Sequence, residues 1–252
     1  MVTLDTDVFG YLAPEQEHNG RLTLYGEFLG SDPSVAIVPV RVSPLYLETA
    51  VHAVRAGIFK GLLVDPAYYG TAGQLMDVLR RPADETGVVD FVYQDSNTGA
   101  LVGDCIAVEA FRSLVNDVLM KTKDAMAIVM GTGWETLVAM KAMRGLLTFM
   151  TIVGESTEQT ENLDAGCRVE FMEEGYDSSP FDLVVNFGDG YEKPAGQTTV
   201  NMVSGMDADI SPVHFEAMRL AMSVTVGRGL PGYLDRQIYG EFLKKLNKGY
   251  KH

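Results

Sequence analysis

The residues best suited to chemistry lie in the stretch IVMGTGWETLVAM, residues 128–140. An apolar run leads into Gly131, Thr132 and Gly133, and residues that favour a helix follow. A glycine turn between a buried strand and a helix aims the first N–H groups of the helix at a phosphate group. The full pattern would have a small residue three positions after Gly133, where Thr136 stands. The sequence therefore indicates a pyrophosphate-binding turn, with a plain strand-to-helix turn as the alternative.

Three further side chains bear on this turn. Glu155 ends the next apolar run, 24 residues after Gly131. A carboxylate near that spacing accepts the ribose hydroxyls of NAD and repels the extra phosphate of NADP; the alternative is a solvated loop carboxylate. Trp134 either stacks on a nucleotide, blocks the nucleotide groove or covers the helix start. Glu135 places a negative charge beside a pyrophosphate. We therefore predict NAD in preference to NADP, bound weakly.

The elements that would position these residues alternate along the chain. Apolar or β-branched runs predict strands over 35–42, 61–66, 124–131, 146–156, 181–190 and 198–204. Helical spacing predicts helices over 43–61, 68–81, 107–120, 134–145 and 233–249, with Ser43 and Pro44 at the first start. The turn-rich DSNTG, between two apolar runs, predicts a hairpin over 87–104. Strands alternating with helices indicate α/β domains with parallel sheets.

Composition limits the classes of partner. The 252 residues carry 20 Lys and Arg against 34 Asp and Glu, for a formal charge of −14. Such a surface repels nucleic acid and anionic membranes, so a small molecule is the expected partner; a homodimer is left open. The sequence shows neither a signal peptide nor a ~20-residue apolar span. Two isolated cysteines and four scattered histidines predict no metal site. Two lone thiols suit the reducing cytoplasm.

The order of the segments resembles the shikimate/quinate dehydrogenase family over nearly the whole chain. GALVGD (99–104) is similar to the family's G-x-L-x-G-D stretch, and AFRSL follows where the family has its linking helix. Other segments match in the same order: EHN (17–19), GTGWET (131–136), TIVGES (151–156), VVNFG (184–188) and GLPGYLDRQ (229–237). The resemblance implies a substrate domain over 1–105, closed by residues 230–252, and a Rossmann-like nicotinamide-binding domain over 106–229. The two domains would face each other across a cleft.

The resemblance also assigns residues to roles. Asp104 and Gln237 match family positions; Asp104 is expected to be catalytic together with Tyr68, and Gln237 is the position that reaches a substrate hydroxyl. His18 lies at the start of the first helix of the substrate domain, while Asn186 and Gly188 lie on a cofactor-side segment. The chain departs from the family at several positions: among them, Tyr68 stands at the family's catalytic lysine, and Ala107 at its partner aspartate. The arginine that favours NADP in the family is replaced by Glu155.

The departures change the expected chemistry. Reduction of a ketone by hydride needs a proton donor, which Tyr68, or equally its neighbour Tyr69, would supply. Asp65, Asp90 and Asp104 would line an acidic substrate site suited to a neutral or cationic ligand. The structural alternatives are that both tyrosines cover the domain as loop aromatics, and that Asp65 and Asp104 cap the elements that follow them.

Two functions therefore compete. The first is an NAD(P)-dependent oxidoreductase acting on a small polar alcohol or ketone other than shikimate. The second is a catalytically inactive relative, a pseudoenzyme that binds a small molecule or a protein partner. A methyltransferase with a similar glycine turn is a third reading.

Overall fold

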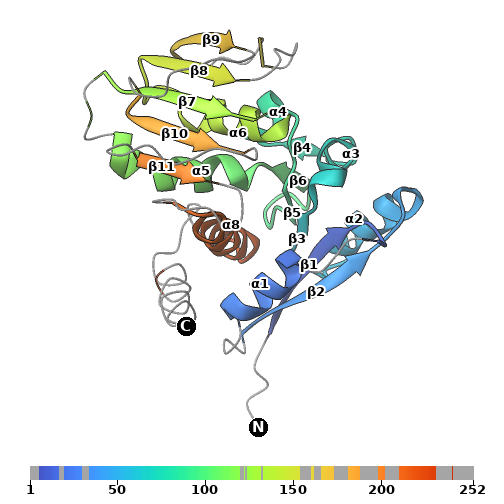
Figure 1. Cartoon of the computed structure of the whole chain (residues 1–252). Helices are drawn as coiled ribbons and strands as arrows, with labels where there is room; N and C mark the ends of the chain where they lie inside the picture. The colour runs from blue at the N-terminus through green and yellow to red at the C-terminus, as the bar shows by residue number, and fades with distance from the viewer. Residues whose placement is uncertain are drawn as a thin grey trace. The chain divides into compact units, whose positions relative to one another are not determined.

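The computed structural model describes residues 6–16, 20–29, 34–119, 122, 124–131, 133–153, 160–161, 166–172, 181–187, 198–201, 210–230 and 240. The chain divides into two compact units, Met1–Ile106 with Ala217–His252 and Ala107–Glu216. The sequence placed these divisions at 105/106 and 229/230, so residues 217–229 lie in the first unit in the structure. Both units are mixed α/β, in agreement with the predicted fold class (Figure 1).

The first unit is built on a six-stranded sheet. Its order is β2 (Val35–Arg41), β1 (Asp7–Ala13), β3 (Gly61–Val64), β5 (Phe91–Gln94), β6 (Leu101–Asp104) and β4 (Val78–Leu79). Neighbouring strands are parallel except that β5 runs antiparallel to both β3 and β6. The predicted hairpin is confirmed: β5 and β6 pair, and the side chain of Asp95 accepts N–H bonds from Asn97 and Thr98 in the turn.

Three strands of this sheet differ from the sequence prediction. β4 lies within the stretch 68–81 that was predicted as one helix, of which Tyr69–Gly73 is α-helical. β2 was expected to be a buried strand, but it lies at the sheet edge and most of its residues are partly or fully exposed. Pro39 lies within it, and proline lacks the N–H that a central strand needs. β1 was not predicted, yet it lies between β2 and β3. Phe9 and Tyr11 point to one of its faces, and Gly10 and Leu12 to the other.

Helices cover both faces of this sheet. Helix α2 (Leu47–Arg55) buries its apolar side and follows a 3₁₀ turn at Pro44–Tyr46. Ser43 and Pro44 start this segment as predicted, although the Ser43 side chain makes no capping hydrogen bond. Further helical elements of this unit are α1 (Gly20–Leu29), a 3₁₀ turn at Pro66–Tyr68, α3 (Tyr69–Gly73) and α4 (Arg81–Thr86).

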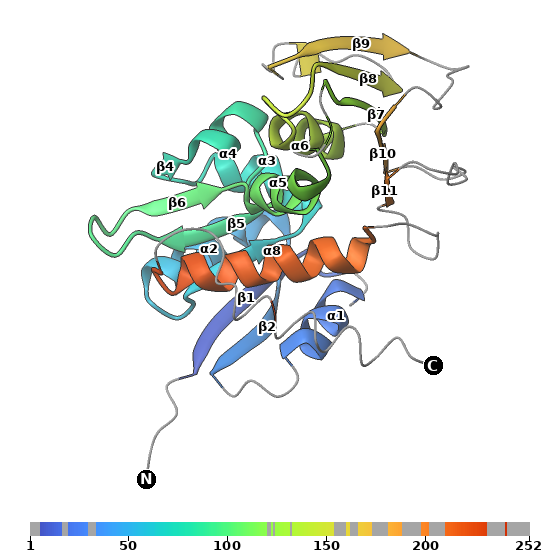
Figure 2. The ribbon, with the colours of Figure 1, turned by 90° about the vertical axis from the view of Figure 1, so that its left-hand side faces the viewer.

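Helix α8 (Pro212–Gly227) packs on the Phe9 face of the sheet, and the sequence analysis did not predict it. A Cβ on Gly227 would stand 3.0 Å from Cζ of Phe9, so only glycine allows this close approach. α1 reaches the same face, where Tyr25 makes an edge-to-face contact with Tyr11 at 5.8 Å. Figure 2 shows α8 running along this side of the sheet.

The second unit holds a five-stranded parallel sheet. Its order is β11 (Thr198–Asn201), β10 (Leu183–Asn186), β7 (Met126–Met130), β8 (Phe149–Val153) and β9 (Arg168–Met172). Counted from β7, this is the 3-2-1-4-5 order of dinucleotide-binding sheets, with the order reversing between β7 and β10. Four of the strands were predicted. β9 was missed because charged Arg168 and Glu170 alternate along this edge strand.

Helices α5 (Ile106–Leu119) and α6 (Trp134–Ala142) lie on the same side of this sheet (Figures 1 and 2). The sheet contributes a cluster of buried apolar residues formed by Ile128, Met130, Phe181 and Val184. Both helices confirm sequence predictions. The predicted closing helix over 233–249 lies outside the described residues except for Gly240. Among the helices described, none is long and apolar enough to cross a membrane.

Candidate functional site

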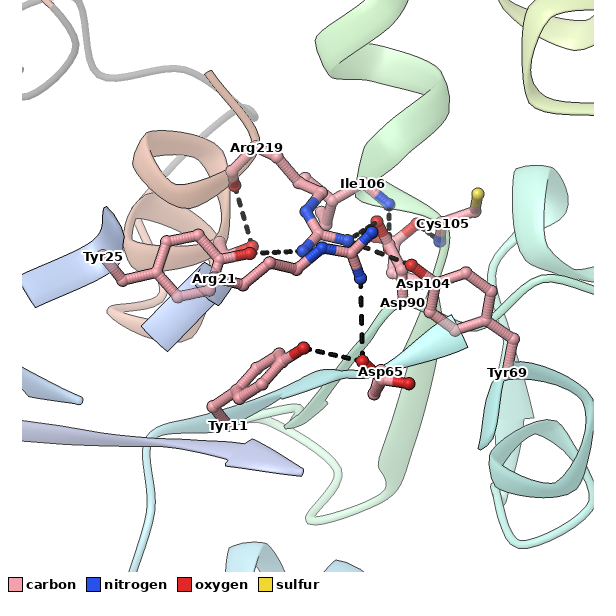
Figure 3. A network of polar contacts seen from close by, with 11 residues as sticks. Tyr11, Arg21, Tyr25, Asp65, Tyr69, Asp90, Asp104, Cys105, Ile106 and Arg219 are labelled. Carbon is pink, nitrogen blue, oxygen red and sulfur yellow. Dashed lines mark hydrogen bonds and ion pairs between the residues drawn. The ribbon is translucent and has the colours of Figure 1, made fainter. Parts of the chain in front are cut away.

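Asp65 is the first residue after β3 and holds three groups together. Its Oδ1 accepts the N–H of Ala67 at 3.0 Å, which caps the 3₁₀ turn as the structural alternative predicted. Its Oδ2 accepts the hydroxyl of Tyr11 at 2.7 Å and lies 3.7 Å from Nη1 of Arg21 (Figure 3). Burial of Tyr11 raises its pKa, and the hydrogen bond to Asp65 and the negative charge of Asp65 raise it further. The positive charges of Arg21 and Arg219 lower the pKa by less. The Tyr11 proton is therefore held on the phenol.

Arg219 on α8 is the centre of a second set of contacts. Its side chain is 1% exposed, and its guanidinium donates to the hydroxyls of Tyr25 and of Tyr69, the latter at 3.1 Å. Nη1 also lies 3.7 Å from Oδ2 of Asp90, which is fully buried. Figure 3 shows the guanidinium between the two tyrosines, with Asp90 beside it. A buried guanidinium is tolerated only with such partners, so the four side chains form one unit.

Asp90 and Asp104 also hold the start of α5. Oδ1 of Asp90 accepts the N–H of Ile106, the first residue of the helix, at 2.6 Å. Oδ1 of Asp104 accepts the N–H of Cys105 at 2.9 Å, and its Oδ2 lies 3.6 Å from Nε of Arg80. The capping role foreseen for Asp104 is thus shared, because the first helical N–H goes to Asp90.

These contacts correct the expectation of an acidic site. Asp65 pairs with Arg21, Asp90 with Arg219 and Asp104 with Arg80, all at 3.6–3.7 Å. The arginines come from α1, α8 and the segment after β4, which are far from their partners in sequence. The local charge is therefore balanced, and Arg219 in particular lies on a helix that the sequence analysis missed.

The two adjacent tyrosines differ in how their hydroxyls are used. Tyr68 donates its proton to the backbone carbonyl of Val42 at 2.6 Å. Burial, followed by the charges of Glu15 and Asp65, raises its pKa, which opposes the proton loss predicted for a donor at this position. Tyr69 instead accepts an N–H of Arg219 on its oxygen. A cation donating to a phenol oxygen stabilises the phenolate, so the arrangement favours Tyr69 for proton transfer.

The glycine turn between β7 and α6 has the expected backbone. Gly131 has φ +148° and Gly133 φ +75°, conformations that side chains with a Cβ rarely adopt. A Cβ on Gly131 would also stand 2.8 Å from Cβ of Phe187. The Thr136 hydroxyl donates to the Gly131 carbonyl at 2.9 Å. Thr136 stands where the usual pattern has a small residue, and its side chain stabilises the turn through this hydrogen bond. Asn186 ends β10 opposite Met130 and is buried at the same sheet edge.

The backbone of this turn is suited to the pyrophosphate of a dinucleotide, and the side chain of Glu135 is the feature that is not. Gly133 occupies the N-cap position of α6 and contributes no capping side chain. The second glycine of such a turn lets a pyrophosphate approach the backbone. Among the described residues, apart from the chain neighbours of Gly133, the atom within 4 Å of the position a Cβ would take is Oε2 of Glu135, at 3.7 Å. Trp134, at the first position of the helix, is half-buried.

The remaining predicted site residues lie outside the described part of the chain: His18, Thr132, Glu155, Gly188 and Gln237. Among the described residues, no group of three or more His, Cys, Asp or Glu side chains is arranged to hold a metal ion.

The structure is similar over nearly its whole length to solved structures of dehydrogenases. Shikimate dehydrogenase from Aquifex aeolicus shares 14% identity with a TM-score of 0.74, covering 98% of this chain and 99% of that one. The 5-ketofructose reductase of Gluconobacter sp. strain CHM43 shares 13% identity with a TM-score of 0.72 (96% and 99% covered). Quinate dehydrogenase from Corynebacterium glutamicum, in complex with NAD, shares 16% with a TM-score of 0.71 (95% and 99%).

No protein-family model and no curated protein matches the chain. At these identities the comparisons establish the fold, which is that of the shikimate dehydrogenases. The resemblance stated from the sequence is therefore confirmed at the level of fold.

Proposed function

We propose that the chain is an NAD-dependent oxidoreductase that interconverts a small polar alcohol and the corresponding ketone, with a substrate other than shikimate. The observation that carries the proposal is the buried pair of Arg219 and Tyr69, because it places a polarised phenol in the unit that corresponds to the substrate domain. The fold supports the proposal, since the similar structures are named as dehydrogenases and a reductase of a ketosugar.

The chain's own residues would handle the proton. During reduction Tyr69 gives its hydroxyl proton to the carbonyl oxygen, and during oxidation it takes the proton back. Arg219 stabilises the phenolate in between, and Asp90 and Tyr25 hold the guanidinium in place. The nicotinamide, when bound, supplies or accepts the hydride that balances this proton. Tyr68 does not take part in this step, because its hydroxyl is bonded to the Val42 carbonyl.

The cofactor would be held by the second unit. The backbone at Gly131 and Gly133 and the first N–H groups of α6 receive the pyrophosphate, and Asn186 borders the same edge. The spacing of Glu155 favours ribose hydroxyls over a ribose phosphate, so we propose NAD over NADP. This preference rests on the sequence, because Glu155 lies outside the described residues.

The substrate would be neutral. Arg21 and Arg219 are already paired with Asp65 and Asp90, so a substrate carboxylate would have to displace a buried partner. A neutral hydroxyketone instead needs only hydrogen bonds, which the aspartates and tyrosines of this network can exchange. His18 and Gln237 are proposed to add contacts to the substrate hydroxyls.

An activity screen with two tyrosine variants tests the proposal. We expect NADH-dependent reduction of at least one neutral hydroxyketone, and no oxidation of shikimate or quinate. Y69F should lower kcat by roughly 10²–10⁴-fold, the usual contribution of general acid–base catalysis. Y68F removes the hydroxyl next to it in sequence and should leave kcat within a few-fold, so it is the matched control. A Y69F enzyme as active as the wild type would remove Tyr69 from the mechanism, and rapid turnover of shikimate would refute the substrate assignment.

A second candidate function, the pseudoenzyme, is favoured by one observation: the carboxylate of Glu135 lies on the open side of Gly133. In that case the fold would bind a small molecule or a partner protein without hydride transfer. Binding of nicotinamide dinucleotides separates the two candidates, because a pseudoenzyme of this kind shows none.

A further inference from the structure

Glu135 is the second residue of α6 and the acidic residue of its first turn. A carboxylate at a helix N-terminus is attracted to the N–H groups that the first turn leaves without helical partners. Here the side chain folds toward the turn, with Oε2 at 3.7 Å from the position of a Gly133 Cβ. The charge therefore lies over the glycine and does not point outward from the helix.

The position of this carboxylate beside Gly133 is important because the second glycine of a dinucleotide turn has a specific role in binding. In a dinucleotide turn its missing side chain leaves room for the pyrophosphate to contact the backbone. Gly133 keeps the positive φ of such a turn, and among the described residues that do not adjoin it in the chain, Glu135 supplies the atom within 4 Å of a Gly133 Cβ. Glu135 thus brings a negative charge to the place where a pyrophosphate oxygen would lie.

We propose that Glu135 is an affinity-determining residue that acts as an internal substitute for the pyrophosphate, so that a dinucleotide must displace its carboxylate to bind. The proposal rests on the proposed function, because it assigns the control of the same cofactor site. It predicts a weakly bound cofactor that exchanges readily, since each binding event repeats the displacement. The Thr136–Gly131 hydrogen bond and the conformations of the two glycines also hold the backbone of the turn, so E135Q is expected to keep the fold.

The test compares the full chain with E135Q, which keeps the shape of the side chain and removes its charge. E170Q is the matched control, because it removes one negative charge from the edge strand β9 of the same unit and leaves the turn unchanged. NADH and ADP are titrated by calorimetry at low salt, and circular dichroism checks that each variant is folded. Removing a like charge from beside the pyrophosphate relieves a repulsion that grows as water is excluded, so E135Q should lower both dissociation constants about tenfold.

The outcomes separate this proposal from the proposed function. Tighter binding of NADH and ADP to E135Q, with E170Q equal to the wild type, supports the role of Glu135. Equal dissociation constants for wild type and E135Q overturn that role and leave the oxidoreductase assignment standing. If E135Q gains affinity for ADP while no variant binds NADH, Glu135 keeps its role and the oxidoreductase assignment fails. If neither probe binds any variant, both proposals are overturned.

Discussion

The polar network of the first unit and the glycine turn of the second are held in different ways. Around Arg219, side chains from α1, α3 and the strand ends meet, and the position of each depends on the others. At Gly131 and Gly133 the geometry is that of the backbone itself, fixed over a few consecutive residues. The network is non-local and buried, whereas the turn is local and partly exposed.

This difference explains why the turn was visible in the sequence and the network was not. It also separates the expected consequences of mutation. Loss of one member of the network leaves the others buried without partners, which costs more than the lost contact. A change in the turn acts through backbone strain or local charge, so its effect on stability should be smaller and its effect on ligand binding larger.

The largest effect on stability should follow R219M. Methionine fills much of the same volume but leaves the fully buried Asp90 without its cation, and breaking a buried pair in this way costs roughly 3–5 kcal/mol. Urea unfolding of the purified, folded variant measures the loss in the free energy of unfolding. The control is R168M, whose arginine is 75% exposed and pairs with Glu170 at the surface, with an expected cost of less than about 1 kcal/mol. Similar midpoints for both variants would show that the network is not a structural unit.

A smaller loss is expected from G131A. Alanine must adopt φ +148° and its Cβ would meet Cβ of Phe187 at 2.8 Å, so strain of order 1–3 kcal/mol is expected. G26A serves as the control, because Gly26 lies inside α1 and its added Cβ meets no atom within 4 Å from the described residues beyond its chain neighbours and its own helix backbone. There alanine should be neutral or stabilising by up to about 1 kcal/mol. Thermal unfolding compares the two, and an equally stable G131A would mean that the turn is more adaptable than its backbone indicates.

E135Q should have a still smaller effect on stability. A carboxylate in the first turn of a helix stabilises it by roughly 0.3–1 kcal/mol, and the amide loses this interaction. The change is measured by urea unfolding at low salt and again at high salt, where screening should shrink it. A loss above about 2 kcal/mol would exceed any helix-terminus interaction of this kind and would make Glu135 a structural residue.

The smallest effect is a pH dependence that comes from His214. Its Nδ1 accepts the N–H of Ser211 at 3.3 Å at the start of α8, and burial lowers the pKa of the imidazole below its ordinary 6.5. The neutral ring is thus favoured by folding, so its stabilisation is complete above pH 6.5 and declines as the pH falls toward the folded pKa. H214Q should show a flatter stability profile between pH 7.5 and 5.5 by urea unfolding. An unchanged slope would assign the pH dependence to other groups.

Much of the fold could be read from the sequence because its signals are local. β7 is an uninterrupted apolar run, and Asp95 to Gly99 form a turn-rich break between two strands. Helix α8 was not predicted because it is apolar on nearly all sides. This composition is typical of a buried helix but gives no amphipathic pattern. The lone Arg219 within AMRLAMSV was the available signal, since an arginine among apolar residues needs buried partners.

The site was only partly predictable for the same reason. Asp90 and Asp104 were found because they fall on matched positions of the family, and Asp65 because it lies between a predicted strand and Pro66. The arginines that pair with them could not be found, since each pairing joins segments that the sequence does not bring together. Tyr68 and Tyr69 show that an alignment by sequence alone cannot choose between adjacent residues. The hydroxyl of Tyr68 bonds to a backbone carbonyl, whereas that of Tyr69 bonds to Arg219.

The most direct test of the account is a titration of the purified chain with NADH and NADPH. Trp134, the single tryptophan, begins the helix after the glycine turn and reports binding there by its fluorescence, with calorimetry as the independent readout. The account predicts weak, saturable binding of NADH and weaker binding of NADPH. No heat and no fluorescence change with either nucleotide would contradict it and leave the fold without its cofactor.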